Sequence, residues 1–235
     1  MIMSEEETRQ RLLELHNMRL LPQTTVEYLY KMRYEQSVFP GVIYDVGACV
    51  LHWTNEAVKV WPDKQFYCFE AMPETAFLYD RPFIYGYHNG VLSNVDGGKT
   101  SFYQNTYHPG GNSYYKENVD VNPQAEEYFN ESHRVEYPTR TLDSVAAEKG
   151  FPIPDLIKMD VQGAEMDILM GAQSCLTHAQ HLILELQVVE YNKGAPLVHT
   201  VKDYLSSVGF EMVGDGPFTN AGPDGDYHFI RTNAW

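Results

Sequence analysis

The chain has 235 residues, which is enough for one sizeable domain with its own core and too few for two. It carries 32 acidic residues against 17 lysines and arginines, and its formal net charge is −15. A chain this acidic is not expected to bind nucleic-acid backbones or to insert into anionic membranes, because both require clustered cations. Small molecules and neutral glycans remain as the expected partners.

The first 40 residues are predicted to form a helical lid or arm on a domain of residues 41–235. Apolar residues recur at helical spacing over 4–32, and Pro22 divides this segment in two. The segment starts with acidic residues and has no uninterrupted apolar core, so neither a signal peptide nor a membrane span is predicted. We therefore expect a cytoplasmic protein. Apolar residues on the arm make a homodimer conceivable.

The cysteines agree with a reducing compartment. Cys49, Cys68 and Cys175 are odd in number and lack C-x-x-C spacing, so neither a disulfide framework nor a thiolate zinc site is predicted. We expect buried thiols.

Apolar runs alternate with helical patterns along most of the chain, which predicts an α/β fold with helices on both faces of a mostly parallel sheet. Strands are predicted at 42–48, 65–70, 83–85, 90–93, 100–103, 156–161, 181–186, 210–213 and 227–231. Helices are predicted at about 53–61, 72–79, 140–145, 164–172 and 197–208.

Residues 105–137 lose this periodicity and are rich in Tyr, Asn, Gly and His. An insertion of this length in a compact domain is commonly a functional loop. We interpret it as a substrate loop, with a structural loop packed by its own aromatic side chains as the alternative. Tyr114, Tyr115 and Trp53 are candidate sugar platforms, or ordinary packing residues.

The first predicted β-α-β unit carries a signal for a nucleoside ligand. Gly47 follows the first strand and lets a ligand approach the backbone, and Glu70 ends the second strand, where it can accept hydrogen bonds from ribose hydroxyls. The unit lacks the G-x-G-x-x-G series that receives a pyrophosphate. This favours S-adenosylmethionine over a dinucleotide.

A second strand-turn-helix segment surrounds Asp160. The apolar run 156–161 carries this carboxylate near its end, Gly163 interrupts the run, and a helical pattern begins at Ala164. Ligands of open α/β sheets bind at the carboxyl edge of the strands, so Asp160 is expected in the site.

Five motifs together resemble those of the FkbM-type S-adenosylmethionine-dependent methyltransferases. They are DVGA at 45–48, FEAMP at 69–73, RTLD at 140–143, IKMDVQGAE at 157–165 and VEYN at 189–192. The resemblance covers residues 42–230. It implies a Rossmann-like class I methyltransferase fold with a seven-stranded sheet, mostly parallel, whose last strand is antiparallel. It also implies O-methylation, commonly of sugar hydroxyls in polysaccharides, glycolipids or glycosylated natural products.

The resemblance also assigns cofactor-binding residues. It places Asp45, Gly47 and Ala48 beside the amino-acid part of S-adenosylmethionine and Glu70 on the ribose. The other residues expected around the cofactor are Ala71 and Met72 beside the adenine, Ser93 and Asp160. The chain departs from the D-V-G-A-N-x-G pattern of the family, with Cys49 in place of Asn and Leu51 in place of the second Gly.

Methylation of a sugar hydroxyl requires a base or a metal ion, because the hydroxyl is too weak an acid to ionise near neutral pH. Among the histidines we favour His108 over His88 and His133, because Pro109 and two glycines follow it and would let it fold over the site.

Two carboxylates form the alternative catalytic group. Asp160 and Glu185 end predicted neighbouring strands, so they are expected to converge and either share a proton or bind Mg²⁺. Purely structural roles for both, as a cap and as a loop anchor, are equally compatible with the sequence.

Two other functions remain open at this point. Methylation of a lipid or polyketide hydroxyl would require an apolar acceptor pocket, which the polar insertion disfavours. A catalytically inactive, methyltransferase-like binding scaffold is the alternative from a different class. Cys49 and Leu51 favour it, and intact Glu70 and Asp160 argue against it.

Overall fold

The computed structural model describes residues 3–18, 21–219 and 222–232. Parts of the predicted ranges 1–40 and 41–235 therefore lie outside the described residues, including residues 19–20 of the predicted helical segment. The helices are α1 (Glu5–Asn17), α2 (Gln23–Tyr34), α3 (His52–Val60), α4 (Ala125–Tyr128), α5 (Leu142–Lys149), α6 (Glu165–Met170), α7 (Gln173–His178) and α8 (Val198–Ser207). The strands are β1 (Val42–Val46), β2 (Gln65–Glu70), β3 (Ile84–Asn89), β4 (Val91–Leu92), β5 (Lys99–Tyr103), β6 (Arg134–Arg140), β7 (Leu156–Met159), β8 (His181–Gln187), β9 (Phe210–Met212) and β10 (Asp224–Arg231). Short 3₁₀ turns cover Pro73–Leu78, Pro109–Gly111 and Glu131–His133.

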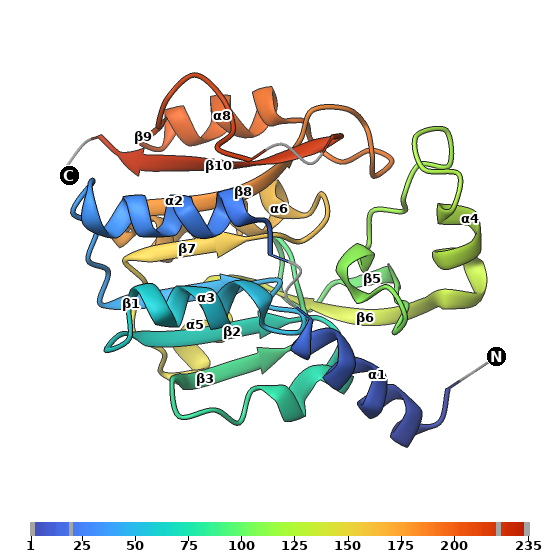
Figure 1. Cartoon of the computed structure of the whole chain (residues 1–235). Helices are drawn as coiled ribbons and strands as arrows, with labels where there is room; N and C mark the ends of the chain where they lie inside the picture. Colours follow the sequence, from blue (N-terminus) through green and yellow to red (C-terminus); the bar gives the residue numbers. More distant parts are fainter. Residues whose placement is uncertain (1–2, 19–20, 220–221, 233–235) are drawn as a thin grey trace.

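A seven-stranded sheet in the order β3-β2-β1-β7-β8-β10-β9 forms the centre of the molecule (Figure 1). Five adjacent strands of this sheet run parallel, namely β3, β2, β1, β7 and β8. Strand β10 runs antiparallel to both of its neighbours, β8 and β9. The predicted sheet, mostly parallel with an antiparallel last strand, is thereby confirmed. Val46 pairs with Met159, and Met159 pairs with Leu184. This register brings the residues that follow them, among them Asp160 and Glu185, to the same edge of the sheet.

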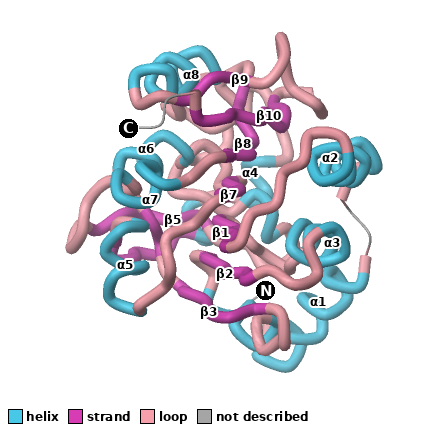
Figure 2. The backbone as a smooth tube through the Cα atoms, turned by 90° about the vertical axis from the view of Figure 1, so that its left-hand side faces the viewer, coloured by secondary structure: helices cyan, strands magenta, loops and turns pink. Residues whose placement is uncertain are grey.

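Helices cover both faces of the sheet, as Figure 2 shows with α5, α6 and α7 on one side and α1, α2 and α3 on the other. The side chains of β1 alternate between these layers. Tyr44 and Val46 belong to the core formed with α5 to α8, and Ile43 belongs to the core formed with α2 and α3. A strand buried on both faces needs an unbroken apolar run, which is why the central strands were predictable from sequence.

The two N-terminal helices pack on the domain instead of extending from it. Ser4 caps α1 in a reciprocal capping box with Glu7. Leu12 and Leu15 of α1 are buried against the loop that follows β1, beside Leu51. Whether this segment also acts as a movable lid stays a prediction.

The segment between β3 and α5 differs from the sequence-based prediction. Residues 84–89 form the edge strand β3, and 91–92 leave the main sheet as β4 and join a three-stranded sheet of order β4-β6-β5. The predicted loop 105–137 contains α4 and the start of β6. Strand β6 was missed because it is largely exposed and includes Pro138, so it lacks an apolar pattern. The predicted helix 164–172 ends at Met170, and a separate helix, α7, follows it.

Along the part of the chain that the structure describes, none of the helices has both the length and the apolar character needed to cross a membrane.

Candidate active site

The loop after β1 brings the backbone close to Asp160. Gly47 has a φ of 78°, and a Cβ at this position would lie 1.8 Å from the carbonyl oxygen of Asp160. Only glycine permits this close approach. Farther along the loop, Cys49 and Leu51 also have positive φ, at 44° and 68°. Two non-glycine residues of this loop therefore adopt the left-handed backbone conformation, which is energetically unfavourable for them.

Glu70, at the end of β2, ties two loops together. Its Oε2 accepts a hydrogen bond from the backbone N–H of Cys49 at 2.8 Å, and its Oε1 accepts one from Met72 at 2.9 Å. Burial raises the pKa of the Glu70 carboxyl, although these two backbone hydrogen bonds favour the ionised form. The carboxylate is thus fixed in place beside the cavity described next.

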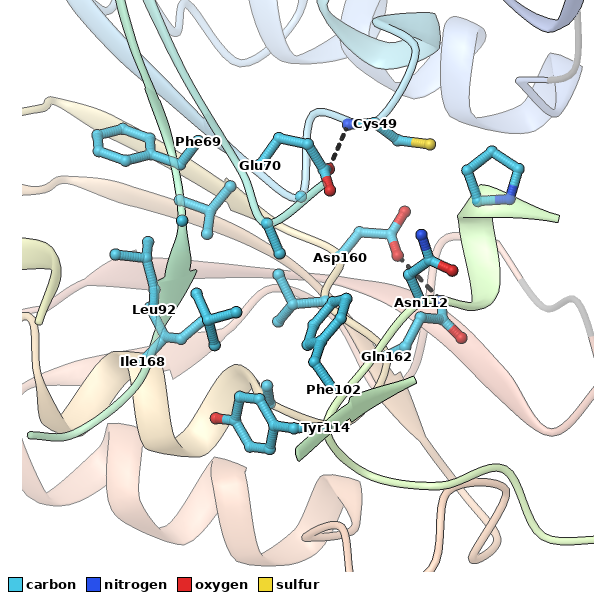
Figure 3. A pocket seen from close by; sticks show the side chains of 18 of the residues that line it. Cys49, Phe69, Glu70, Leu92, Phe102, Asn112, Tyr114, Asp160, Gln162 and Ile168 are labelled. Carbon is cyan, nitrogen blue, oxygen red and sulfur yellow. Dashed lines mark hydrogen bonds between the residues drawn. The ribbon is translucent and has the colours of Figure 1, made fainter. Parts of the chain in front are cut away.

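A cavity that we call the central cavity opens between the ends of β1, β2 and β7 (Figure 3). Glu70, Asp160 and Asn112 lie toward one end of it, and Leu92 and Ile168 lie toward the other. Phe102 and Tyr114, from the segment between β3 and α5, complete the wall. The cavity combines an apolar slot with carboxylates, which suits a flat heterocycle carrying hydroxyl groups.

The carboxylates of Asp160 and Glu185 converge, as the strand ends predicted. Gln162 bridges them, because its Nε2 donates to Asp160 Oδ1 at 3.1 Å and to Glu185 Oε2 at 2.8 Å. Gln162 has a positive φ of 53°, and its carbonyl accepts a hydrogen bond from Ser113 Oγ at 2.9 Å. The insertion is therefore linked directly to the residue that holds the carboxylate pair.

The two carboxyl groups of this pair have opposite pKa shifts. Burial and the charge of Asp160 raise the pKa of Glu185 well above its ordinary value. Burial also acts to raise the pKa of Asp160, but Lys158 together with hydrogen bonds from Glu185 and Gln162 outweighs it and lowers that pKa. When the pair holds a single proton, that proton therefore lies mainly on Glu185, which is the stronger base of the two.

The residues around this pair do not resemble a metal site. Within the described ranges, no group of three or more His, Cys, Asp or Glu side chains is arranged to hold a metal ion. The Nζ of Lys158 lies 3.5 Å from Asp160 Oδ2 and supplies a positive charge where a cation would otherwise be needed. The structure thus gives no support to the Mg²⁺ alternative.

Two further cavities adjoin the central one. The acidic cavity is lined by residues from the loop after β1 and from the ends of β7, β8 and β10, and it includes Asp160, Glu185 and Asp226. The basic cavity lies between α1 and the 3₁₀ turn Pro109–Gly111. Cys49 and Gly110 line all three cavities, so the cavities adjoin one another at these two residues, and we refer to the three together as the cleft.

Some of the predicted cofactor residues line this cleft, and others are buried behind its wall. Gly47, Glu70, Ala71 and Asp160 line the central cavity, and Ala48 lines the acidic one. Asp45, Met72 and Ser93 are buried and are not among the described residues that line the central cavity. The carboxylate of Asp45 accepts from Thr54 and pairs with Lys158, which places it below the site.

The predicted histidines are dispersed. His108 lines the basic cavity, with its ring 3.9 Å from that of Tyr128, centroid to centroid. His88 is partly buried, and burial lowers its pKa to about 4. His133 lies in the turn before β6. None of the three lines the central or the acidic cavity as described.

The aromatic candidates take different places. Tyr114 and Tyr115 both donate their hydroxyls to Asp167, and Tyr114 also lines the central cavity. Trp53 lines the acidic cavity.

Sequence reasoning missed Gln162 and Asn112. Gln162 lies two positions after Asp160, just before the predicted turn at Gly163, so its proximity to the pair could have been inferred. Asn112 lies in a segment without periodicity, and its contact with Met72 Sδ at 3.5 Å had no signal in the sequence.

With this geometry in place, comparison with known proteins decides the family. The profile of the methyltransferase FkbM domain matches residues 45–212. The chain belongs to the FkbM methyltransferase family. The match includes the end of β1 and all of β2, β7 and β8, whose carboxyl ends carry Glu70, Asp160 and Glu185.

Two curated relatives are similar to this FkbM methyltransferase. The 2-O-methyltransferase NoeI of Sinorhizobium fredii is 38% identical over 88 residues, which are 37% of this chain and 34% of NoeI. The chain thus matches only about a third of NoeI's length. Methyltransferase 1 of Beauveria bassiana is 26% identical over 214 residues, covering 82% of this chain and 84% of that protein.

Solved structures share the fold of this FkbM domain. The methyltransferase FkbM of Methylobacillus flagellatus matches with a TM-score of 0.50 at 12% identity, covering 95% of this chain and 58% of that one. An O-methyltransferase family 2 protein of Planctomyces limnophilus matches with a TM-score of 0.51 at 11% identity, covering 98% and 62%. At such identities the likeness shows the class I methyltransferase fold alone.

Proposed function

We propose that this FkbM methyltransferase uses S-adenosylmethionine to methylate a hydroxyl of a sugar, a polysaccharide or a glycosylated metabolite. One observation carries the proposal. The fixed carboxylate of Glu70 lines the central cavity, Glu185 lines the adjoining acidic cavity, and Asp160 lines both. A nucleoside held at Glu70 would place its reactive end beside the pair.

The residues present fit the cofactor. Glu70 is positioned to accept hydrogen bonds from ribose hydroxyls, and the apolar slot formed by Leu92, Phe102 and Ile168 suits adenine. Gly47 lets the loop after β1 pack closely against the backbone of Asp160, and it lines the central cavity, where the amino-acid part would lie. S-adenosylmethionine, when bound, supplies an electrophilic methyl group on a positively charged sulfur.

The chain's own residues supply alignment and a proton acceptor. The acceptor hydroxyl would approach in line with the methyl group and lose its proton as the new O–C bond replaces the methyl C–S bond, with S-adenosylhomocysteine as the leaving group. Glu185, the more basic carboxylate of the pair, receives this proton when it is ionised, since the charge of Asp160 stabilises its protonated form. Asp160 and Glu185 line the acidic cavity, whereas His108 lines only the basic one, so the position of the pair favours it over His108 as the base.

Several features favour a hydroxylated acceptor over a lipid. The acidic cavity carries Asp160, Glu185, Asp226 and Thr219, whose side-chain oxygens offer hydrogen-bond acceptors beside apolar residues such as Leu21 and Trp53. A lipid or polyketide acceptor would lack partners for these groups. The name of NoeI, a 2-O-methyltransferase, supports O-methylation, although the similarity covers 37% of this chain.

Calorimetric titration with S-adenosylhomocysteine tests the proposal. Wild-type protein should bind with micromolar affinity, and Glu70→Ala should lose at least about tenfold in affinity while remaining folded, with a lower thermal midpoint because the N–H groups of Cys49 and Met72 lose their acceptor. Glu74→Ala, an acidic residue in the turn that follows β2, is the matched control and should bind like wild type. Absence of wild-type binding would favour the inactive scaffold. Transfer of a labelled methyl group to neutral and acidic sugars then identifies the acceptor.

A further inference from the structure

The basic cavity has an unusual charge for this protein. It is lined by Arg11, His52, His108 and Tyr107, together with apolar and glycine residues, and the described residues that line it include no Asp or Glu. The chain as a whole carries a net charge of −15. With an arginine, two histidines and no carboxylate, the cavity therefore has a charge opposite in sign to that of the whole chain.

Arg11 is available to a ligand. Its Nη2 donates to the carbonyl of Tyr107 at 3.1 Å, and its guanidinium lies 5.6 Å from the centroid of the Tyr107 ring. Within the described residues it forms no ion pair, and its buried Nε has no hydrogen-bond partner. A guanidinium held by one carbonyl retains donors for a bidentate contact with a carboxylate or phosphate.

Two histidines line the same cavity as Arg11, and His108 can add a donor for an anion when its ring is protonated. His52 Nε2 lies 2.7 Å from the carbonyl oxygen of Leu15, which can only accept, so this nitrogen carries a proton and the ring is fixed. Burial and the nearby charge of Arg11 lower the pKa of His108. Glu127 acts in the opposite direction on His108 but is the smallest of the three effects. An anion placed between Arg11 and His108 would relieve their repulsion.

The position of the basic cavity relates it to the methyl acceptor. It meets the other two cavities at Cys49 and Gly110, and the acidic cavity with Asp160 and Glu185 lies on the other side of this junction. The carboxylates would repel an anionic group, and the arginine would attract it. An acceptor with one anionic group would thus enter with that group toward α1 and its hydroxyls toward the carboxylate pair.

We propose that the basic cavity is a subsite for a carboxylate or phosphate group of the acceptor, so that the enzyme methylates a sugar acid or a sugar phosphate. This inference rests on the proposed function. It changes the expectation of a neutral glycan drawn from net charge, because the charge at the cleft differs from that of the whole chain. The cavity volume of about 320 Å³ has room for a sugar ring with its anionic group.

Binding of simple anions provides the first test, using the full chain. The imidazole of His108 is followed by NMR over pH in the presence of inorganic phosphate, glucuronate or glucose. Phosphate or glucuronate should raise the pKa of His108, because an adjacent anion stabilises the imidazolium, and glucose should leave it unchanged. Arg11→Gln should abolish the shift. Arg9→Gln, which removes a charge from the same helix at a residue that stacks on Phe77, is the control.

Kinetics with matched acceptors separates the sources of the anion. The Michaelis constants of an aryl glucoside, the corresponding glucuronide and glucose 1-phosphate are compared in wild type, Arg11→Gln and Arg9→Gln. Arg11→Gln should raise KM about tenfold or more for whichever anionic acceptor is used, with little change for the glucoside. Preference for the glucuronide identifies a sugar acid, and preference for the phosphate identifies a sugar phosphate.

Two results would overturn the subsite. One is an unchanged His108 titration with both anions. The other is a tenfold loss of S-adenosylhomocysteine affinity in Arg11→Gln, which would assign the cavity to the carboxylate of the cofactor. Failure of the wild type to bind S-adenosylhomocysteine would instead reject the proposed function, and the phosphate titration would still report on the cavity.

Discussion

The Nζ of Lys158 lies 3.2 Å from Asp45 Oδ1, with both side chains buried in the centre of the sheet. The two residues face each other across paired strands, and the ammonium also reaches Asp160. Coulombic attraction from both carboxylates raises the pKa of Lys158 despite its burial. This buried ion pair therefore links β1 to β7 near the carboxyl ends of the strands, next to Asp160.

Lys158→Met should destabilise the protein by about 3–5 kcal/mol, because it leaves Asp45 with an uncompensated buried charge. Chemical denaturation at neutral pH measures the change in the free energy of unfolding. Lys158→Met combined with Asp45→Asn should recover a large part of the loss, since no unpaired carboxylate then remains at position 45. Equal losses in the single and double variants would show that the pair contributes through packing alone.

The carboxylate pair should set the acidic limb of the pH–rate profile. Because the charge of Asp160 raises the pKa of Glu185, Asp160→Asn should move this limb to lower pH. Glu185→Gln should remove the limb and lower kcat by roughly 10²-fold, as expected for loss of a general base. Profiles of kcat between about pH 5 and pH 9 make the comparison. A limb that keeps its position in Asp160→Asn would contradict the coupling.

Glu165 should make stability depend on pH. Its carboxyl accepts hydrogen bonds from the backbone of Val161 and Gly163, and burial raises its pKa from 4.5 to about 7. A folded-state pKa above the unfolded value favours the protonated form. The contribution is therefore complete below pH 4.5 and is lost as the pH rises through about 7, by about 3 kcal/mol in total.

Glu165→Gln removes this titration and should be more stable than wild type at about pH 8, with a smaller difference at about pH 5. Thermal unfolding at both pH values measures the effect, and Glu126→Gln, an exposed residue of α4, is the control. A variant less stable than wild type at both pH values would show that the ionised carboxylate is the better hydrogen-bond acceptor there.

The strained turn at Cys49 gives a prediction about stability. At its φ of 44°, asparagine is tolerated better than most residues, and valine is tolerated poorly. Cys49→Asn should raise the free energy of unfolding by about 0.5 kcal/mol, and Cys49→Val should lower it by about 1–2 kcal/mol. Urea denaturation of the two variants beside wild type measures the difference. Equal stability of both variants would mean that the turn relaxes when residue 49 changes.

Much of the fold could be predicted because its central strands are buried on both faces. Their apolar runs, such as residues 156–159, can be recognised without knowledge of their partners. The small sheet was harder to predict. Strand β6 pairs with β4 and β5 from distant parts of the chain, and its side chains are mostly exposed, so its strand character comes from tertiary pairing.

The site was predictable where it follows from strand ends. Glu70, Asp160 and Glu185 come at the ends of predicted strands, and the parallel topology brings those ends together. The basic cavity could not be predicted in this way. Arg11 and His108 are 97 positions apart, in a helix and in an irregular turn, and only the packing of α1 on the insertion places them at one cavity.

The position of β10 between β8 and β9 affects how the protein can be synthesised. Strand β9 leaves the ribosome before the strand with which it pairs, and β8 keeps an open edge until residues 224–231 have emerged. During that interval β8, which is largely buried in the finished sheet, exposes unpaired backbone groups and apolar side chains. A ribosome stalled between β9 and β10 would therefore carry a nascent chain prone to aggregation, and a chaperone that shields β8 would protect it.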